Sequence, residues 1–388
     1  MALPDQDLPG QLVHTIRRTV DGIFYLSPRP NCVRGLAYTY GLGVEASGIM
    51  PHVELTMSNH RHGVFTCLTG LRSEFHQRHH GVFAQQYNGR LGRSGYMWDH
   101  RGPTKPVLLC EPGEEQKFAF AAGESKKERD LWFSRWDEQG LDTVERTIVY
   151  CLLNPVSANL VQEVRSFPGF KITPSDWGKW SVNARPSWFE RDYPDVTAFM
   201  ALPPPQWWDN AEFVPTGDSR FVVSPETLAK FEARREWAKR NNPTGEARFD
   251  AAAFELFISR ERLAEAIAHY EGLVELFEAQ FLQERLAAGK RVLGRGALRK
   301  QDPFFAPAGP NPIRRNSRYK PRFIGSAAAV QKAHTAYRNF CSNYWTATTL
   351  LKTTRNFNIT FPAGTVRMAL VANVCCRGAP LPEENPML

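Results

Sequence analysis

Residues 53–65 read VELTMSNHRHGVF, in which two runs containing apolar residues flank a polar pair. The pattern predicts two short strands joined by a two-residue turn at Ser58 and Asn59. Side chains alternate between the faces of a strand, so His60 and His62 are expected on the same face. Two imidazoles in this arrangement can hold one divalent cation. The alternative is a polar strand face with two surface histidines, because such short spacings are common.

A second segment, DTVERTIVYCLLNPVSANLV at residues 142–161, predicts an amphipathic helix. Asp142 suits the N-cap position, and Glu145 three residues later completes a capping-box pattern. The apolar residues that recur at helical spacing are Val144, Ile148, Cys151 and Leu152.

Tyr150 and Asn154 are four residues apart on this helix and therefore share a face. A tyrosine hydroxyl can act as a covalent nucleophile. An asparagine carbonyl oxygen is a hard ligand that suits Mg²⁺ or Mn²⁺. The alternative is a half-buried tyrosine and a helix-end asparagine that precedes Pro155.

The two segments together resemble a known protein family. The order N-H-x-H after a methionine-containing strand, then Y-x-x-x-N-P-V-x-A-x-L-V, is similar to the motifs of single-tyrosine HUH transposases. The branch it resembles most is the REP-associated tyrosine transposases, which are related to the small insertion-sequence transposases. Residues 75–98, FHQRHHGVFAQQYNGRLGRSGYMW, are similar to the family's linking helix and G-R-x-G-x-x-W segment. The resemblance covers roughly residues 10–170, and an F-P-x-G-T ending at residues 361–365 extends it.

This resemblance implies a ferredoxin-like α+β catalytic domain at residues 10–170, whose antiparallel sheet carries the histidine pair against the tyrosine helix. Beyond it, the composition predicts an irregular Pro- and Trp-rich connector at residues 171–225. Residues 226–388 are expected to form a mainly helical extension with a basic DNA-contacting segment.

The activity that the resemblance implies is DNA transposition, by cleavage and rejoining of single-stranded or hairpin DNA. Tyr150 would attack the scissile phosphate, expel a 3′-hydroxyl and form a 5′-phosphotyrosine link. His60, His62 and Asn154 would hold Mg²⁺ or Mn²⁺. A domesticated, weakly active or inactive hairpin-DNA-binding protein is the alternative, and monomer and homodimer both stay open. A zinc-dependent DNA-binding regulator is a third hypothesis, which the lack of Cys–His spacing disfavours.

Arg61 departs from the family's pattern, in which the residue between the two histidines is usually apolar. On the opposite face of the strand it would meet the core, where an unpaired charge is costly. We expect either that Arg61 reaches the edge of the sheet or that this face is less covered.

Cations and aromatic residues near the motifs are candidates for phosphate contact and base stacking. The alternatives are an ordinary basic loop with a core tryptophan at residues 89–101 and a solvated basic loop at residues 289–322. His76, His79 and His80 are expected on a DNA-facing helix rather than in a zinc cluster, because no cysteine lies nearby. The candidate DNA-binding residues are Arg17, Arg18, Arg78, Arg90, Arg93, Trp98, Arg101, Arg314, Arg315, Arg318, Lys320 and Arg322.

Other elements follow from composition and period. Residues 1–14 are expected to form a loose arm and residues 14–26 to contain an edge strand. Helices are expected at residues 31–48, 71–88, 224–288 and 330–351, and the last core strand at residues 107–110. The Gly-rich stretch GLGVEASG at 41–48 is expected to mark the end of the first of these helices.

The 388 residues carry a net charge of +8 with a pI of about 9.1, which suits a polyanionic partner. Seven cysteines without a C-x-x-C pair indicate reduced thiols and a cytoplasmic protein, nucleoid-associated if it binds DNA. No apolar run approaches 18 residues, and the N-terminus does not resemble a secretion signal, so no membrane partner is expected.

Overall fold

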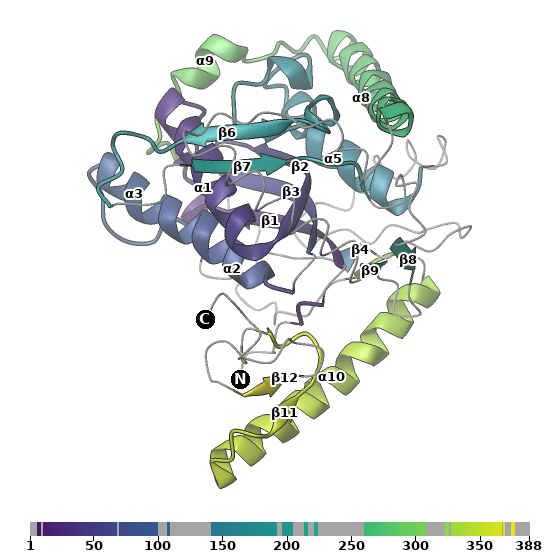
Figure 1. Cartoon of the computed structure of the whole chain (residues 1–388). Helices are drawn as coiled ribbons and strands as arrows, with labels where there is room; N and C mark the ends of the chain where they lie inside the picture. The colour runs from purple at the N-terminus through teal and green to yellow at the C-terminus, as the bar shows by residue number, and fades with distance from the viewer. Residues whose placement is uncertain are drawn as a thin grey trace.

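The computed structural model describes residues 6–8, 11–67, 70–99, 107–108, 141–191, 196–204, 213–215, 221–223, 260–307, 323–325, 327–366, 368 and 374–376 (Figure 1). Within these residues the fold is α+β, with helices packed on both faces of a central sheet. No described helix is both long and apolar enough to cross a bilayer.

The central sheet is built on the predicted hairpin. Its strand order is β10-β4-β1-β3-β2-β5, and neighbouring strands are antiparallel except for β10, which is parallel to β4. The strands are β1 (Gln11–Arg18), β2 (Ile49–Thr56), β3 (His60–Cys67), β4 (Val107–Leu108), β5 (Lys171–Ile172) and β10 (Phe323–Ile324).

One face of the sheet is covered by the helices between β1 and β4. They are α1 (Pro30–Ser47), α2 (Arg72–His76), a π-helical turn (Gln77–Val82) and α3 (Phe83–Arg90). Pro30 is the first residue of α1, a position whose backbone N–H would have no partner within the helix, so the lack of an N–H in proline costs no hydrogen bond. Gly48 follows the last residue of α1 and adopts the left-handed conformation. Phe65 of β3 packs against Phe75 of α2 with ring centroids 5.2 Å apart.

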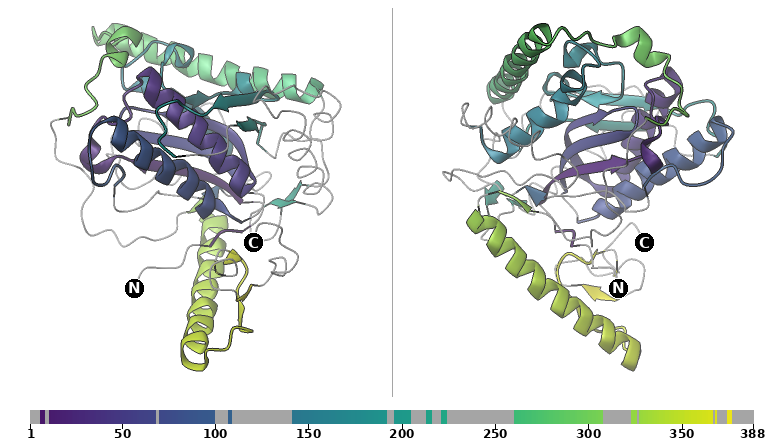
Figure 2. Two further views of the ribbon diagram at one scale, coloured as in Figure 1. Left: turned by 60° about the vertical axis from the view of Figure 1, so that its left-hand side comes forward. Right: turned by 180° about the vertical axis from the view of Figure 1, so that it is seen from behind.

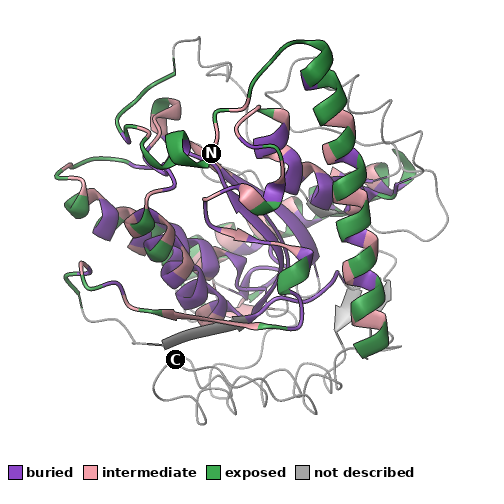
Figure 3. Cartoon of the chain, turned by 90° about the horizontal axis from the view of Figure 1, so that it is seen from above, coloured by how far each residue is buried: buried purple, intermediate pink, exposed green. Residues whose placement is uncertain are grey.

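The other face of the sheet is covered by α5 (Thr143–Ser157), and α8 (Arg260–Ala287) packs on α5. The Asp142 side chain accepts from the backbone N–H groups of Val144 and Glu145, and Glu145 accepts from the Asp142 N–H. The predicted capping box is therefore confirmed. Figure 3 shows the central strands as buried, with the exposed residues on the outer sides of the helices.

The remaining elements lie outside the central layers. They are the turns at Val20–Gly22, Val164–Ser166 and Pro174–Asp176, the paired strands β6 (Trp180–Ala184) and β7 (Val196–Met200), β8 (Phe213–Pro215) and β9 (Phe221–Val223), the helices α9 (Arg295–Arg299) and α10 (Ala327–Thr354), and the strands β11 (Thr360–Phe361) and β12 (Cys375–Cys376). The views agree that α10 extends away from the sheet (Figure 2). Helix α10 confirms the helix expected at residues 330–351. Helix α8 confirms the later part of the helical region expected at residues 224–288, and residues 224–259 lie outside the described residues.

The predicted hairpin turn is confirmed. Thr56 pairs with Arg61, and the Met57 N–H donates to the His60 carbonyl over 2.7 Å, so only Ser58 and Asn59 lie in the turn. A first helix within residues 31–48 is confirmed, but the Gly-rich stretch at 41–48 does not interrupt it, and α1 continues to Ser47. The helix expected at 71–88 is confirmed, and so is the strand expected at 107–110 at its first two residues, the other two lying outside the described residues.

The expectations for the N-terminus were wrong. The strand begins at Gln11, within the supposed loose arm, and lies inside the sheet between β3 and β4 rather than at its edge. It ends at Arg18, because Asp21 (φ 54°) and Gly22 (φ 69°) adopt the left-handed conformation, which ends an extended strand. The irregular connector also contains short strands, β5 and the β6–β7 and β8–β9 pairs, too short to show a period.

Neither expectation for Arg61 was right, because the side chain is fully buried and paired with Glu54. Its Nε donates to Glu54 Oε1 over 2.7 Å, its Nη2 donates to Glu54 Oε2, and its Nη1 lies 3.0 Å from His80 Nε2. Glu54 lies diagonally across from Arg61 on the neighbouring strand β2. The charge is compensated inside the core and does not need to reach solvent.

Gly63 leaves the space that this ion pair occupies. A Cβ at residue 63 would clash with Glu54 Oε2 and with Arg61 Nη2, both of which are buried. We expect Gly63→Ala to lower the free energy of unfolding by about 2–4 kcal/mol, through overpacking and disruption of the pair. Urea denaturation measures this change.

The matched control is Gly272→Ala on α8, where an added Cβ meets nothing within 4 Å. We expect that variant to be neutral or more stable by up to about 1 kcal/mol, because alanine favours helix. Equal stability of Gly63→Ala and wild type would contradict the account of the buried pair.

Candidate active site

His60 and His62 of β3 lie on the sheet face that α5 covers, with ring centroids 5.0 Å apart. Tyr150 of α5 faces them, and its ring centroid lies 5.5 Å from that of His62. The Asn154 Nδ2 donates to the Tyr150 carbonyl over 2.8 Å, and its side chain also hydrogen-bonds to His60. The structure thus brings these four predicted residues together, from two segments about ninety residues apart.

One ring nitrogen of His60 is held by Asn59. Its Nδ1 lies 2.7 Å from Asn59 Oδ1, a carbonyl oxygen that can only accept, so Nδ1 is the donor. The Nε2 of the neutral ring then carries a lone pair, as metal ligation requires.

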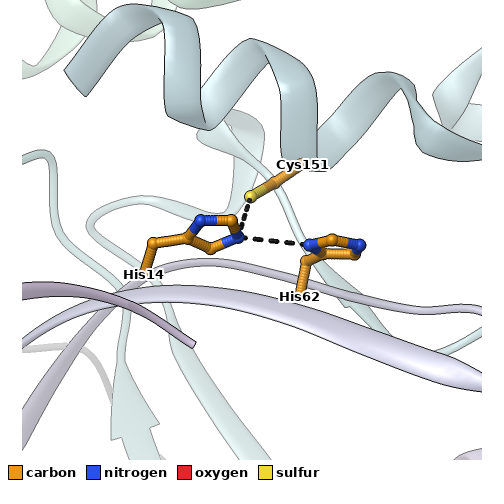
Figure 4. A group of neighbouring side chains, drawn as sticks. All are labelled: His14, His62 and Cys151. Carbon is orange, nitrogen blue, oxygen red and sulfur yellow. Dashed lines mark hydrogen bonds between the residues drawn. The ribbon is translucent and has the colours of Figure 1, made fainter. Parts of the chain in front are cut away.

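His14 of β1 contacts His62 from behind and is itself contacted by Cys151 of α5 (Figure 4). His62 Nδ1 lies 3.1 Å from His14 Nε2, and Cys151 Sγ lies 3.3 Å from the same nitrogen. Figure 4 shows the other ring nitrogen of His62 pointing away from His14. When His14 Nε2 accepts from His62 Nδ1, His62 keeps its Nε2 lone pair free.

Burial determines the charge state of these groups. It lowers the pKa of His14 and of His60 to about 3 and that of His62 well below its usual value, and nearby arginines add to each shift. Burial also raises the pKa of the Cys151 thiol well above its ordinary value. The three imidazoles are therefore neutral at neutral pH, which is the form that binds metal ions.

Two overlapping sets of donors could hold a metal, and His62 belongs to both. The nitrogen ligands His60 and His62 with the Asn154 amide oxygen suit Mn²⁺ or Mg²⁺. The atoms of His14, His62 and Cys151 all lie within 4.8 Å of one another, and their nitrogen and sulfur donors suit a softer ion such as Zn²⁺.

The predicted pair of basic residues on β1 divides between the two faces of the sheet. Arg18 pairs in register with His60 and is half-buried, and its charge lowers the pKa of both His60 and His62. Arg17 pairs with Arg61 on the opposite face and lies over the Trp98 ring at 5.9 Å. Of the two, Arg18 lies on the face of the sheet that carries His60 and His62.

Three other predicted DNA contacts belong to the helices on the opposite face or directly follow them. Arg78 is exposed and pairs with Glu74 over 2.8 Å, and Arg90 is exposed at the end of α3. Arg93 packs over the Tyr25 ring, 4.2 Å from its centroid. Outside the described residues lie Arg101, Arg314, Arg315, Arg318, Lys320 and Arg322.

Trp98 was wrongly assigned to base stacking, because it is only 6% exposed and its Nε1 donates to the His80 carbonyl over 2.9 Å. The expectation of a DNA-facing row of histidines was also wrong. His76, His79 and His80 are buried against the sheet, where His80 neighbours Arg61 and His79 lies 3.1 Å from Thr39 Oγ1. Helical spacing predicted that these histidines share one face of the helix, but not that this face packs against the sheet.

The sequence analysis missed the role of His14 and named Cys151 only as an apolar helix position. His14 has the same parity on β1 as Arg18, and Cys151 directly follows Tyr150. These local signals place both residues on the site's face, but only the pairing of β1 with β3 brings His14 to His62, and only the packing of α5 on the sheet brings Cys151 there.

Comparison with known proteins found no matching family model and no matching curated protein. Among solved structures, the chain matches one described as "Structure of the REP associates tyrosine transposase bound to a REP hairpin", at 13% sequence identity and a TM-score of 0.28. The match covers 50% of this chain and 98% of that chain. A TM-score this low is not evidence of a shared fold.

Proposed function

We propose that this protein is a metal-dependent strand transferase for single-stranded or hairpin DNA, of the single-tyrosine HUH type. The observation that carries the proposal is that Tyr150 and Asn154 of α5 lie against His60 and His62 of β3. A nucleophile beside two neutral imidazoles and an amide is the set that metal-assisted phosphoryl transfer requires. The order β4-β1-β3-β2 within the sheet supports a ferredoxin-like core.

In the proposed reaction the Tyr150 Oη forms a bond to the scissile phosphorus and loses its proton to solvent. The bond from phosphorus to the 3′ oxygen breaks, and that oxygen takes up a proton. The product is a 5′-phosphotyrosine link with a free 3′-hydroxyl, and the reverse attack by a 3′-hydroxyl rejoins a strand. Because one phosphoester replaces another, the step needs no external energy source.

The residues have separate roles in this step. His60, His62 and Asn154 would hold Mg²⁺ or Mn²⁺, which supplies Lewis-acid stabilisation of the phosphate charge. Arg18, half-exposed beside His60, adds a fixed positive charge that attracts the phosphate. Partial burial of Tyr150 against the core restricts its ring to the face of the histidines.

The test uses the full chain with single-stranded hairpin oligonucleotides from the ends of its own locus, incubated with Mn²⁺. We expect a protein–DNA adduct on a denaturing gel that disappears with chelator. Failure to form an adduct with any hairpin or unpaired substrate would overturn the proposal.

His14 is proposed to hold His62 in the tautomer that binds the metal, through the contact of 3.1 Å. Because hydrogen-bond partners of metal-binding histidines typically contribute 10–100-fold in metal affinity, we expect His14→Ala to weaken Mn²⁺ binding by roughly that factor. His14→Gln should recover part of the loss, since its amide oxygen can accept from His62. Titration of Mn²⁺ by electron paramagnetic resonance measures both, and unchanged affinity in His14→Ala would contradict this role.

A zinc-binding DNA regulator is a second candidate, which the cluster of His14, His62 and Cys151 favours. Zinc held there would occupy the His62 nitrogen that faces His14 and would need the Cys151 thiolate. Metal analysis of the purified protein separates the two. Stoichiometric zinc that Cys151→Ser abolishes would support the regulator, and its absence would support the transferase.

A further inference from the structure

Exposed aromatic side chains gather beside the tip of the β2–β3 hairpin. Phe304 and Phe305, which follow α9, are 51% and 50% exposed, and Tyr96 in the loop after α3 is 70% exposed. Large aromatic side chains are costly to leave in water, so a group of them on one surface indicates a binding site.

We call the aromatic residues of these three neighbouring segments the aromatic platform: Phe24, Tyr25, Tyr96, Phe304 and Phe305, of which Tyr25 is buried and supports the others. Ring centroids are 5.1 Å apart for Phe24 and Phe305 and 6.1 Å apart for Tyr25 and Phe304. Arg93 joins the third segment, because its guanidinium lies 4.2 Å from the Tyr25 ring centroid and its Nη2 donates to the Tyr96 carbonyl over 3.0 Å.

Backbone and side-chain hydrogen bonds hold the segment after α9 in place. The Phe24 N–H donates to the Phe305 carbonyl over 2.9 Å. Arg29 donates to the Gln301 carbonyl through Nε (3.3 Å) and Nη2 (2.9 Å). The platform is therefore ordered before any ligand binds, which reduces the entropy lost on binding.

The platform adjoins the candidate active site. Ser58 of the hairpin turn donates from Oγ to Gln301 Oε1 over 2.5 Å, and its carbonyl accepts from the Leu26 N–H over 2.9 Å. Asn59, the next residue, contacts His60 Nδ1. Only Asn59 therefore lies between Ser58, which contacts the segment that carries the platform, and His60, the first histidine of the site.

The charge of the segment that carries the platform suits a polyanion. Residues 290–305 contain five cations and one acid, Asp302, and all six are exposed. The cations are Lys290, Arg291, Arg295, Arg299 and Lys300.

We propose that the aromatic platform binds the unpaired bases of single-stranded DNA, which stack on Tyr96, Phe304 and Phe305 while the neighbouring cations contact the phosphates. Stacking on aromatic faces combined with cations along the backbone is how proteins bind single strands without reading sequence. This inference rests on the proposed function, and it identifies the substrate region as the unpaired nucleotides next to the scissile phosphate.

The test compares Phe304→Ala/Phe305→Ala with wild type, using an unpaired oligonucleotide that contains the fluorescent base 2-aminopurine. Both rings are half-exposed, so their removal should leave the fold intact. We expect at least about tenfold weaker binding and loss of the fluorescence quenching that stacking produces. The slope of log Kd against log salt should not change, because no phosphate contact is removed.

Two control variants isolate the platform. Phe357→Ala removes a ring that is 55% exposed after α10 and should bind as wild type does. Arg299→Gln/Lys300→Gln should flatten the salt slope by up to about 1.4 while quenching remains, at about 0.7 for each single-strand contact. Unchanged affinity and quenching in the double phenylalanine variant would overturn the platform, as would a loss equal to that of Phe357→Ala.

The same measurements separate this inference from the proposed function. All binding is measured without metal, so that no cleavage occurs. Wild type that binds and quenches but never forms an adduct would overturn the transferase and support the platform. A double variant that binds normally and forms the adduct would overturn the platform and support the transferase. A chain that binds no single strand would overturn both.

Discussion

Tyr150→Phe is expected to abolish covalent attachment of DNA while changing the affinity for single-stranded DNA by no more than a few-fold. Only the hydroxyl is nucleophilic, and the phenylalanine ring keeps the edge contact with His62 and the packing of Tyr150 against the core. The proposed link is to a 5′-phosphate, so an oligonucleotide labelled at its 3′ end reports the adduct on a denaturing gel. A 5′ label on the same oligonucleotide reports the released fragment.

The matched control for this change is Tyr344→Phe, which removes the hydroxyl of a half-buried tyrosine on α10. That variant should form the adduct at the wild-type rate. An adduct formed by Tyr150→Phe would mean that another residue is the nucleophile.

Removal of a histidine from the pair is the second change with a large expected effect. We expect His60→Ala and His62→Ala each to abolish cleavage, because each ring supplies one of few nitrogen donors to the metal. Mn²⁺ affinity should fall by more than the roughly 100-fold that loss of a supporting residue can produce. The measurements are Mn²⁺ titration and adduct formation, with a chelator applied to wild type in parallel.

Asn154→Ala should have a smaller effect than either histidine variant, since water can replace one neutral oxygen ligand. His334→Ala on α10, away from the site, is the control and should leave metal affinity unchanged. Cleavage by wild type that continues undiminished in chelator would show that the reaction does not use a metal.

The hairpin and the tyrosine helix could be predicted because local interactions determine them. The Ser58-Asn59 turn sets the pairing of β2 with β3, and strand alternation then places His60 and His62 together. The capping box at Asp142 and Glu145 sets the start of α5. Four predicted site residues therefore lie together, although the reaction itself stays a prediction.

Residues whose neighbours come from distant segments could not be predicted in this way. A period shows that side chains share a face, but not what covers that face. The buried Trp98, the buried histidines of residues 76–80 and the Arg61–Glu54 pair all lie between the sheet and its covering helices. The position of each residue was predicted from its own side chain, whereas its burial depends on which distant segment packs against it.

The sequence by itself determined the strand parity, the turn and the capped helix, because each depends on residues within a few positions of one another. Only the tertiary structure decided that His14 contacts both His62 and Cys151 and that the segment after α9 joins the hairpin tip through Gln301. Those contacts join residues 48, 137 and 243 positions apart. They form only because packing of the whole core brings β1, α5 and the end of α9 to the same place.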